Sequence, residues 1–224
     1  MAAHALDNPV WHSLTTRHAG LAITADGAAR YPAAIVPFAG IAEPTERAAH
    51  QLTSLVADGE SVYIVGVAPA PPPGWSLEPK KPVLQMICDA RAPEVPGPPV
   101  MPMGAAQVPD MVALTDLVFP GFFRPRTLEM GSYYGIYHGE RLAAMAGERM
   151  RLDGYQELSA VCTHPDYTGR GYAQRLLSIL CNSAFDRGLV PFLHVYADNE
   201  RAIGVYRRMS FVDRTVLPFW SLHQ

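Results

Sequence analysis

The sequence has few cysteines, no long hydrophobic run and no surplus of positive charge, and each absence removes a class of protein. Only three of the 224 residues are cysteine, Cys88, Cys162 and Cys181, and no two of them form a CxxC spacing. Such an odd and sparse set indicates reduced, packed thiols. We therefore expect neither disulfides nor a metal site.

The charge balance argues against nucleic acid and membrane partners. The chain carries 18 Lys and Arg against 21 Asp and Glu, a formal net charge of -3, and has no basic run. No apolar run reaches the roughly 18 residues needed to cross a membrane, and the N-terminus lacks the regions of a signal peptide. These features predict a soluble, cytoplasmic protein.

The composition, 49% hydrophobic and 17% charged, is that of a globular protein with a sizeable core. Two proline-rich stretches, 69–74 and 93–102, are expected to be loops because proline continues neither a helix nor a central strand. The first half, residues 1–104, is predicted to be a mixed α/β region without recognisable chemistry. Its expected elements are a helix over 44–57 and strands over 61–67 and 83–88.

The second half, residues 105–224, has a clearer pattern. Its central feature is a Gly-rich turn between a strand and a helix, followed by a second strand that should lie parallel to the first. The helix begins near Gly171 and ends before Gly188, and its apolar residues fall on one face. The full expected order is a helix over 110–117, a hairpin of 135–137 and 141–150, a strand over 158–163, the helix to 187, a strand over 190–196, a helix over 200–209 and a last strand over 211–217.

The Gly-rich turn is suited to binding an anion. Small residues at 169, 171 and 173 keep side chains away, so that backbone N–H groups and the helix dipole can approach a pyrophosphate, with Arg170 as a nearby cation. A close-packed loop is the alternative. A dinucleotide-binding turn would need a third glycine, and a P-loop would need a lysine and a hydroxyl residue where Tyr172 and Ala173 stand.

Residues 168–173 resemble motif A of the GNAT superfamily of N-acetyltransferases, [QR]-x-x-G-x-[GA], except that Thr168 replaces the first Arg or Gln. A second segment, Asn199 to Phe211, is similar to the superfamily's N-x-x-A-x-x-x-Y-x-x-x-x-F pattern. The similarity covers about residues 105–224, and the whole pattern resembles the glycine N-acyltransferase-like branch.

This resemblance implies an α/β GNAT fold, with a mixed central sheet whose parallel strands splay apart, plus an N-terminal α/β half that is a degenerate GNAT-like unit. It also implies acetyl-CoA as cosubstrate, no metal, and direct acetyl transfer to a primary amine of a small molecule or peptide. The N-terminal half would form one wall of the acceptor cleft. The implied acetyl-CoA contacts are Val161, Cys162, Thr163, Gly169, Arg170, Gly171, Tyr172, Ala173, Gln174, Asn199 and Tyr206.

An amine attacks only as the neutral base, so a group that removes its proton is expected. Glu157 is the leading candidate for this base, because it stands eleven residues before Thr168. The same separation is found for the base of related histone acetyltransferases. A solvated strand-end carboxylate is the alternative. The rivals are Glu148, which could instead form an ion pair with Arg149 or Arg151, and His194, which could be a structural histidine.

The leaving thiolate needs a proton, and the resemblance gives that role to Tyr206; simple packing is the alternative. Asn199 could cap the helix that follows, contact the pantetheine arm, or both. Cys162 lacks a visible activating partner, which argues against covalent catalysis.

Several questions stay open at the level of sequence. The loop over 119–126 is a candidate acceptor-side loop, and its Arg124 and Arg126 either hold an acceptor carboxylate or are solvated. A CoA-binding sensor or scaffold without turnover is the alternative function. The last strand could pair across a homodimer or end the sheet of a monomer.

Overall fold

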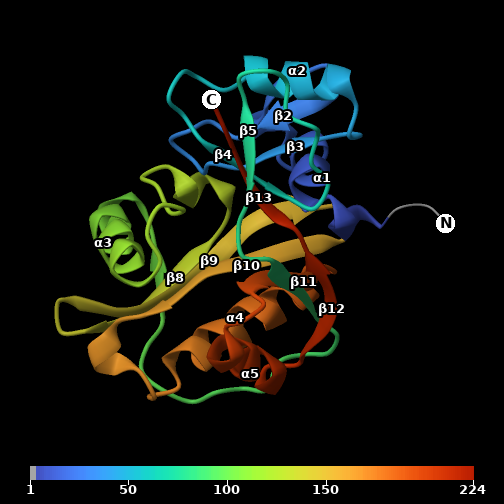
Figure 1. Ribbon diagram of the computed structural model, residues 1–224. Helices are drawn as coiled ribbons and strands as arrows, with labels where there is room; N and C mark the ends of the chain where they lie inside the picture. Colours follow the sequence, from blue (N-terminus) through green and yellow to red (C-terminus); the bar gives the residue numbers. More distant parts are fainter. Residues whose placement is uncertain (1–3) are drawn as a thin grey trace.

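A computed structural model describes residues 4–224. Over this range the chain forms a 7-stranded central sheet and two 3-stranded sheets, with helices packed against them (Figure 1). The main elements in chain order are α1 (Pro9–Thr15), β1 (Ile23–Ala25), β2 (Ala28–Arg30), β3 (Ala39–Ile41), α2 (Glu46–Ser54), β4 (Val62–Val65), β5 (Ser76–Pro79), β6 (Val83–Cys88), β7 (Met101–Met103), α3 (Val108–Val118), β8 (Tyr133–His138), β9 (Arg141–Leu152), β10 (Tyr155–Thr163), α4 (Tyr172–Asp186), β11 (Val190–Tyr196), α5 (Glu200–Arg208), β12 (Phe211–Leu217) and β13 (Phe219–His223).

The central sheet has the order β12-β6-β11-β10-β9-β8-β7. Its one parallel pair is β10 with β11, as predicted, and its other neighbours are antiparallel. Two of its strands, β6 and β7, come from residues 1–104, so the sheet crosses the predicted division at residue 104. That division stays a prediction about how the chain is organised.

The parallel strands separate soon after they begin. The pairing runs from Tyr155 and Val190 to Glu157 and Phe192 and then stops. Beyond it β10 carries register shifts against β9, and Ala160 has a positive φ of 51°. These irregularities bend β10 away from β11, and they produce the splay that the sequence predicted between 158–163 and 190–196.

The two faces of the sheet are covered by different elements. Ala144 and Ala146 of β9 pack into the core cluster that contains α4, whereas Met145 between them packs into the cluster that contains α3. This alternation follows from the two-residue period of a strand. In Figure 1, α4 and α5 lie together below the sheet, and α3 lies on its other side.

The C-terminal strand was not predicted. Sequence patterns ended the fold with a strand over 211–217, but Pro218 breaks that strand and β13 continues into a second sheet with the order β4-β13-β5. Proline cannot donate a ladder hydrogen bond, so the chain changes sheet at this point. The C-terminus thereby reaches the N-terminal elements at the top of Figure 1. Among the helices of the described residues, none combines the length and apolar character needed to span a membrane.

Candidate active site

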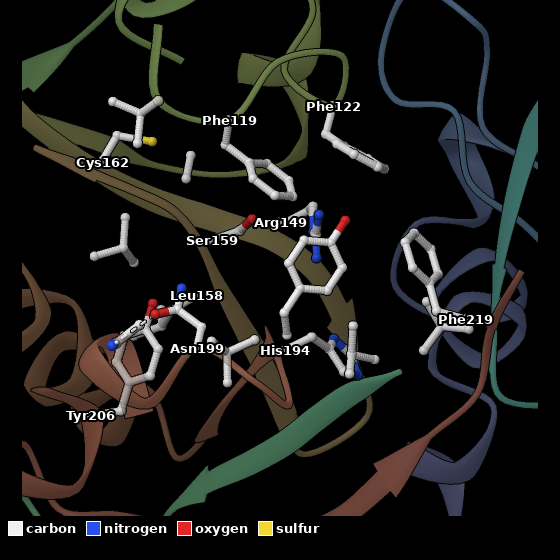
Figure 2. A pocket seen from close by; sticks show the side chains of 18 of the residues that line it. Phe119, Phe122, Arg149, Leu158, Ser159, Cys162, His194, Asn199, Tyr206 and Phe219 are labelled. Carbon is white, nitrogen blue, oxygen red and sulfur yellow. Dashed lines mark hydrogen bonds between the residues drawn. The ribbon is translucent and has the colours of Figure 1, made fainter. Parts of the chain in front are cut away.

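A cavity of about 250 Å³ opens where β10 and β11 separate. One end is formed by the splayed strands and α5, and the other is lined by aromatic residues from distant parts of the chain. In Figure 2, Asn199 and Tyr206 lie at the first end and Phe122 and Phe219 at the other, with Arg149 between them. Phe38, Val65 and Val83 come from residues 1–104, so that half of the chain supplies part of the wall.

The predicted pyrophosphate cradle has the backbone geometry that its sequence suggested. Gly169 and Gly171 have φ values of 78° and 76°, a region that favours glycine, and no heavy atom lies within 4 Å of a Cβ placed on either. Gly171 is the N-cap of α4, and no side chain of the described residues caps this helix end. The first-turn amides of Tyr172, Ala173 and Gln174 therefore lie at an open helix N-terminus. Arg170 lies over the ring of Tyr167, 5.1 Å from its centroid.

Two side chains of the second motif lie at the splayed end of the cavity. Asn199 accepts a hydrogen bond from the Ala202 backbone N–H at 3.1 Å, which confirms its role as a helix cap. Tyr206 packs edge-on against Phe211 at 6.0 Å and lines the cavity. Burial raises the pKa of Tyr206, so its hydroxyl keeps its proton at neutral pH and is available as a donor.

The residues of the β10 bulge line the same end. Val161 and Cys162 border the cavity, and Thr163 follows them on the strand. Burial raises the pKa of Cys162 to about 12. The thiol is therefore protonated at neutral pH, which agrees with the argument against a covalent intermediate.

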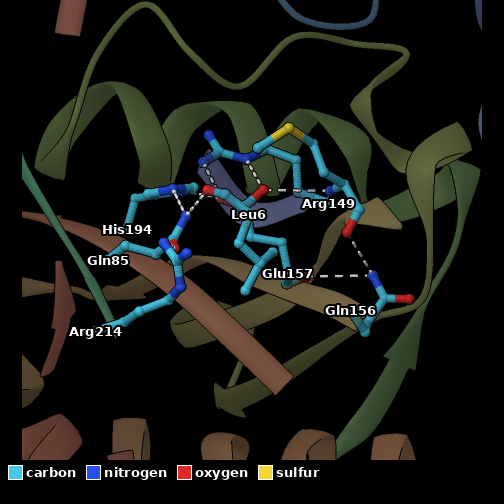
Figure 3. A network of polar contacts seen from close by, with 8 residues as sticks. Leu6, Gln85, Arg149, Gln156, Glu157, His194 and Arg214 are labelled. Carbon is cyan, nitrogen blue, oxygen red and sulfur yellow. Dashed lines mark hydrogen bonds and ion pairs between the residues drawn. The ribbon is translucent and has the colours of Figure 1, made fainter. Parts of the chain in front are cut away.

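Glu157 lies beneath the cavity and does not line it. Its carboxylate is fully buried and accepts two hydrogen bonds from Arg149, at 2.7 Å from Nε to Oε2 and 2.6 Å from Nη2 to Oε1 (Figure 3). Oε1 also accepts from His194 Nδ1 at 2.7 Å, and Oε2 accepts from the Met150 N–H at 3.3 Å.

These contacts decide the protonation of Glu157. Burial alone raises the pKa of its carboxyl group, but the charge and hydrogen bonds of Arg149 and the hydrogen bond from His194 outweigh burial and lower the pKa to about 2. A carboxylate held so firmly in its ionised form is a weak base, and its oxygens are already occupied. The geometry therefore does not suit Glu157 to removing a substrate proton directly, and its part in catalysis stays a prediction.

His194 is held in one tautomer by its neighbours. Gln85 Oε1 accepts from Arg214 at 2.8 Å, so Gln85 Nε2 is the donor to both the Leu6 carbonyl and His194 Nε2, each at 2.9 Å. His194 Nδ1 then carries the hydrogen that Glu157 accepts. In this arrangement the one basic nitrogen of the ring already accepts a hydrogen bond.

Glu148, the third candidate base, lies away from the cavity. It is buried, accepts from Arg187 at the end of α4, and accepts from the Ser132 N–H at 3.2 Å. The ion pair is thus with Arg187, which is distant in sequence, and not with Arg149 or Arg151. The cavity lining contains no Asp or Glu among the described residues.

Only part of the predicted acceptor-side loop, residues 119–126, faces the cavity. Phe119 and Phe122 line it, but Arg124 bonds to the Ala33 carbonyl and Arg126 pairs with Glu129 on the surface. Neither arginine lines the cavity. Arg149 of β9, which is paired with Glu157, does line the cavity.

Sequence reasoning missed several lining residues. Arg149 was considered only as a partner of Glu148, and Phe38 and Phe219 had no motif that could reveal them. The alternation of β9 could have shown that Glu148 and Arg149 face opposite sides of the sheet. Over residues 4–224, no group of three or more His, Cys, Asp or Glu side chains is placed to hold a metal ion.

A splayed parallel pair beside a glycine-lined helix N-terminus, with a tyrosine lining the gap, is typical of an acyl-CoA transferase site. Comparisons with known proteins agree. The FR47-like protein family matches residues 133–219. The fold matches a crystal structure assigned to the GNAT family of acetyltransferases from Novosphingobium aromaticivorans with a TM-score of 0.91 and 38% identity, covering 99% of each chain. The chain therefore belongs to the GNAT family of acetyltransferases, as the two motifs predicted.

Two further relatives are more distant. An 82-residue segment is 37% identical to the N-alpha-acetyltransferase RimI of Mycobacterium tuberculosis, covering 35% of this chain and 51% of the relative, so the match spans about half of that protein. A GCN5-related N-acetyltransferase from Kribbella flavida shares the fold, with a TM-score of 0.60 and 16% identity over 95% of each chain. The mixed α/β fold with splayed parallel strands is thus confirmed.

Proposed function

We propose that the protein transfers an acetyl group from acetyl-CoA directly to a primary amine of a small molecule or peptide. One observation carries this proposal: the pairing of β10 with β11 ends at Glu157 and Phe192. The cavity begins at this point and connects the splayed strands to the aromatic end. The thioester would enter from the splayed end and the amine from the aromatic end. The two would meet near Tyr206.

The residues present fit acetyl-CoA. The pyrophosphate would lie on the open N-terminus of α4, where Gly169 and Gly171 leave room and Arg170 adds positive charge. The pantetheine arm would pair with backbone groups of Val161, Cys162 and Thr163, with Asn199 beside it. A bulge amide of β10 would then donate to the thioester carbonyl as charge develops on its oxygen.

The chemistry forms a C–N bond and breaks the C–S bond, so the nitrogen loses one proton and the sulfur gains one. Tyr206 is proposed to deliver a proton to the sulfur and to be reprotonated by the proton that the nitrogen loses. Because the three candidate bases are engaged elsewhere, the apolar lining is proposed to favour the neutral amine by disfavouring the charged ammonium. Glu157 would then act as a positioning residue that holds Arg149 and His194 at the cavity floor.

We also propose that the chain falls in the glycine N-acyltransferase-like branch, with residues 1–104 as a degenerate GNAT-like half. The support is that Phe38, Val65 and Val83 of this half line the cavity. The cytoplasmic location, the absence of nucleic acid and membrane partners, and the choice between monomer and homodimer stay predictions.

One observation favours the alternative of a CoA-binding sensor or scaffold without turnover. Glu157, the leading sequence candidate for the base, is fully paired, and the cavity has no other carboxylate among the described residues. Under this alternative acetyl-CoA binds but no amine is acetylated. A measurement of transfer separates the two functions.

Acetyl-CoA at ~100 times its Kd is expected to stabilise the wild-type protein by roughly 2.7 kcal/mol, and Gly171→Gln is expected to lose this stabilisation. A glutamine side chain at 171 would fill the open space above the first-turn amides of α4. Thermal unfolding of both proteins, with and without acetyl-CoA, measures the effect.

The matched control is Gly188→Gln at the other end of the same helix. Gly188 also has a positive φ, 70°, and a Cβ placed there would also meet no heavy atom within 4 Å, so the substitution carries the same backbone strain away from the cradle. This variant should keep the full acetyl-CoA stabilisation. Equal stabilisation of all three proteins would contradict the assignment of the pyrophosphate site.

A further inference from the structure

A continuous cluster of six aromatic rings stands at the far end of the cavity, and all of them except Tyr63 line it. They come from separate parts of the chain: Phe38, Tyr63, Phe119, Phe122, Tyr196 and Phe219. Phe119 stacks on Phe122 with ring centroids 5.1 Å apart and lies 5.6 Å from Tyr196. Phe119 is also 42% exposed, so the cluster reaches the surface. A wall of this kind suits a planar apolar group.

A smaller pocket of about 50 Å³ adjoins this end. It shares Phe119, Phe122, Arg149 and Ser159 with the main cavity and is bordered in addition by Tyr133. Figure 2 shows Ser159 and Arg149 close together, between the two phenylalanines and the splay. The pocket is therefore a side chamber of the proposed active site.

Tyr133, which borders this chamber, carries an unsatisfied hydroxyl. The residue is 2% exposed, and its hydroxyl finds no hydrogen-bond partner among residues 4–224. The neighbouring Gly147 leaves room for the ring, since a Cβ there would collide with Tyr133 Cδ1. A buried polar group without a partner is destabilising, so a ligand oxygen that accepts from this hydroxyl would supply the missing hydrogen bond.

Arg149 adds a second donor to the same chamber. Its Nε and Nη2 donate to Glu157, and Nη1 takes part in neither bond. The guanidinium also lies over the ring of Phe38, 4.8 Å from its centroid, which fixes its plane. Arginine only donates, and the tyrosine hydroxyl can also donate, so a group that pairs with both is an oxygen that accepts hydrogen bonds.

We propose that the acceptor is a free amino acid with an aromatic side chain, whose ring packs on the aromatic cluster and whose carboxylate accepts from Tyr133 and Arg149. This inference rests on the proposed function and names its substrate class. A free amino acid fits better than a peptide, because the cavity and its side chamber lie at or below the lower end of the roughly 300–1,000 Å³ of small-molecule sites.

The test is calorimetric titration of acceptors into protein saturated with CoA, so that binding is measured without turnover. The acceptors are L-phenylalanine, phenethylamine, which lacks the carboxylate, and L-alanine, which lacks the ring. We expect L-phenylalanine to bind at least ~10-fold more tightly than either of the other two. The difference from phenethylamine reflects a hydrogen bond to a charged group, and the difference from L-alanine reflects a buried ring.

Tyr133→Phe provides the decisive variant, because it removes only the unpartnered hydroxyl. It should weaken L-phenylalanine binding roughly 10-fold, leave phenethylamine binding unchanged, and not lower the Tm. Phe119→Ala, at a half-exposed ring, should weaken both ring-bearing ligands and leave L-alanine unchanged. A purely structural role for the hydroxyl would change binding of both ring-bearing ligands equally or not at all.

Equal affinities for the three acceptors, or an unchanged affinity of Tyr133→Phe for L-phenylalanine, would overturn this inference. Failure of the proposed function has a different signature, namely no stabilisation by acetyl-CoA or no transfer to any amine. Because the titration uses CoA and no acetyl group, it decides the acceptor class even if no amine is acetylated.

Discussion

Glu157→Gln is expected to lower the free energy of unfolding by about 3–5 kcal/mol, the usual cost of removing one partner of a buried ion pair. Glutamine keeps the size of the side chain but leaves the guanidinium of Arg149 buried without a counter-charge. It also replaces one of the two oxygens that accept from Arg149 by an NH2 group, which only donates. Urea unfolding of the wild type and the variant measures the difference.

The matched control is Glu148→Gln, the neighbouring buried carboxylate of the same sheet. Its partner Arg187 has a side chain that is 34% exposed, so water can solvate the unpaired charge and the loss should be smaller. Replacing both members of the inner pair, with Arg149→Met and Glu157→Gln, should recover part of the stability, because no unpaired charge remains. A loss below about 1 kcal/mol for Glu157→Gln would contradict a tightly coupled pair.

The same ion pair predicts how stability depends on pH. The pKa of Glu157 is about 2 in the folded protein and has its ordinary value of 4.5 in the unfolded chain. Because the pKa is lowered in the folded protein, the ionised Glu157 contributes fully to the free energy of unfolding above about pH 4.5. This contribution is lost as the pH falls towards 2. Unfolding free energies measured between about pH 6 and pH 2 should therefore fall less steeply for Glu157→Gln than for the wild type.

Tyr206→Phe is expected to lower kcat by ~10² to 10⁴-fold, the usual contribution of a positioned acid. The ring should keep its packing against Phe211, so acetyl-CoA binding and the Tm should change little. Steady-state kinetics with L-phenylalanine as acceptor, together with a titration of acetyl-CoA, separates the two effects.

The control for this loss is Tyr137→Phe, which removes a hydroxyl that donates to Asp110 on the surface at 2.7 Å. Its kinetics should match those of the wild type. A Tyr206→Phe variant with unchanged kcat would show that the hydroxyl does not protonate the leaving thiolate, and that Tyr206 serves packing alone.

Local signals made much of the fold predictable from sequence. Gly171 and Gly188 mark the two ends of α4, where the backbone has a positive φ. The apolar residues between them lie on one face of the helix, which shows the face that packs on the sheet. The two motifs were readable because each lies within one short segment. The splay followed from the family resemblance and not from any property of the strands themselves.

The parts that sequence could not predict depend on contacts between distant segments. Gln85 reaches His194 only because β6 lies beside β11, and Phe219 reaches the cavity only because β13 changes sheet after Pro218. The surroundings of Glu157 could not be predicted from its spacing for the same reason. Its environment is set by Arg149 on one neighbouring strand and His194 on the other, and both lower its pKa.

The reaction proposed for this protein is direct acetyl transfer from acetyl-CoA to an amine in the cavity between β10 and β11. Its most direct measurement is to incubate the wild-type protein with acetyl-CoA and an amine panel that includes L-phenylalanine, following free thiol and acetylated amine together by absorbance and mass spectrometry. Direct transfer predicts equal molar amounts of the two products. Thiol without acetylated amine, or neither product while acetyl-CoA still stabilises the fold, would contradict it.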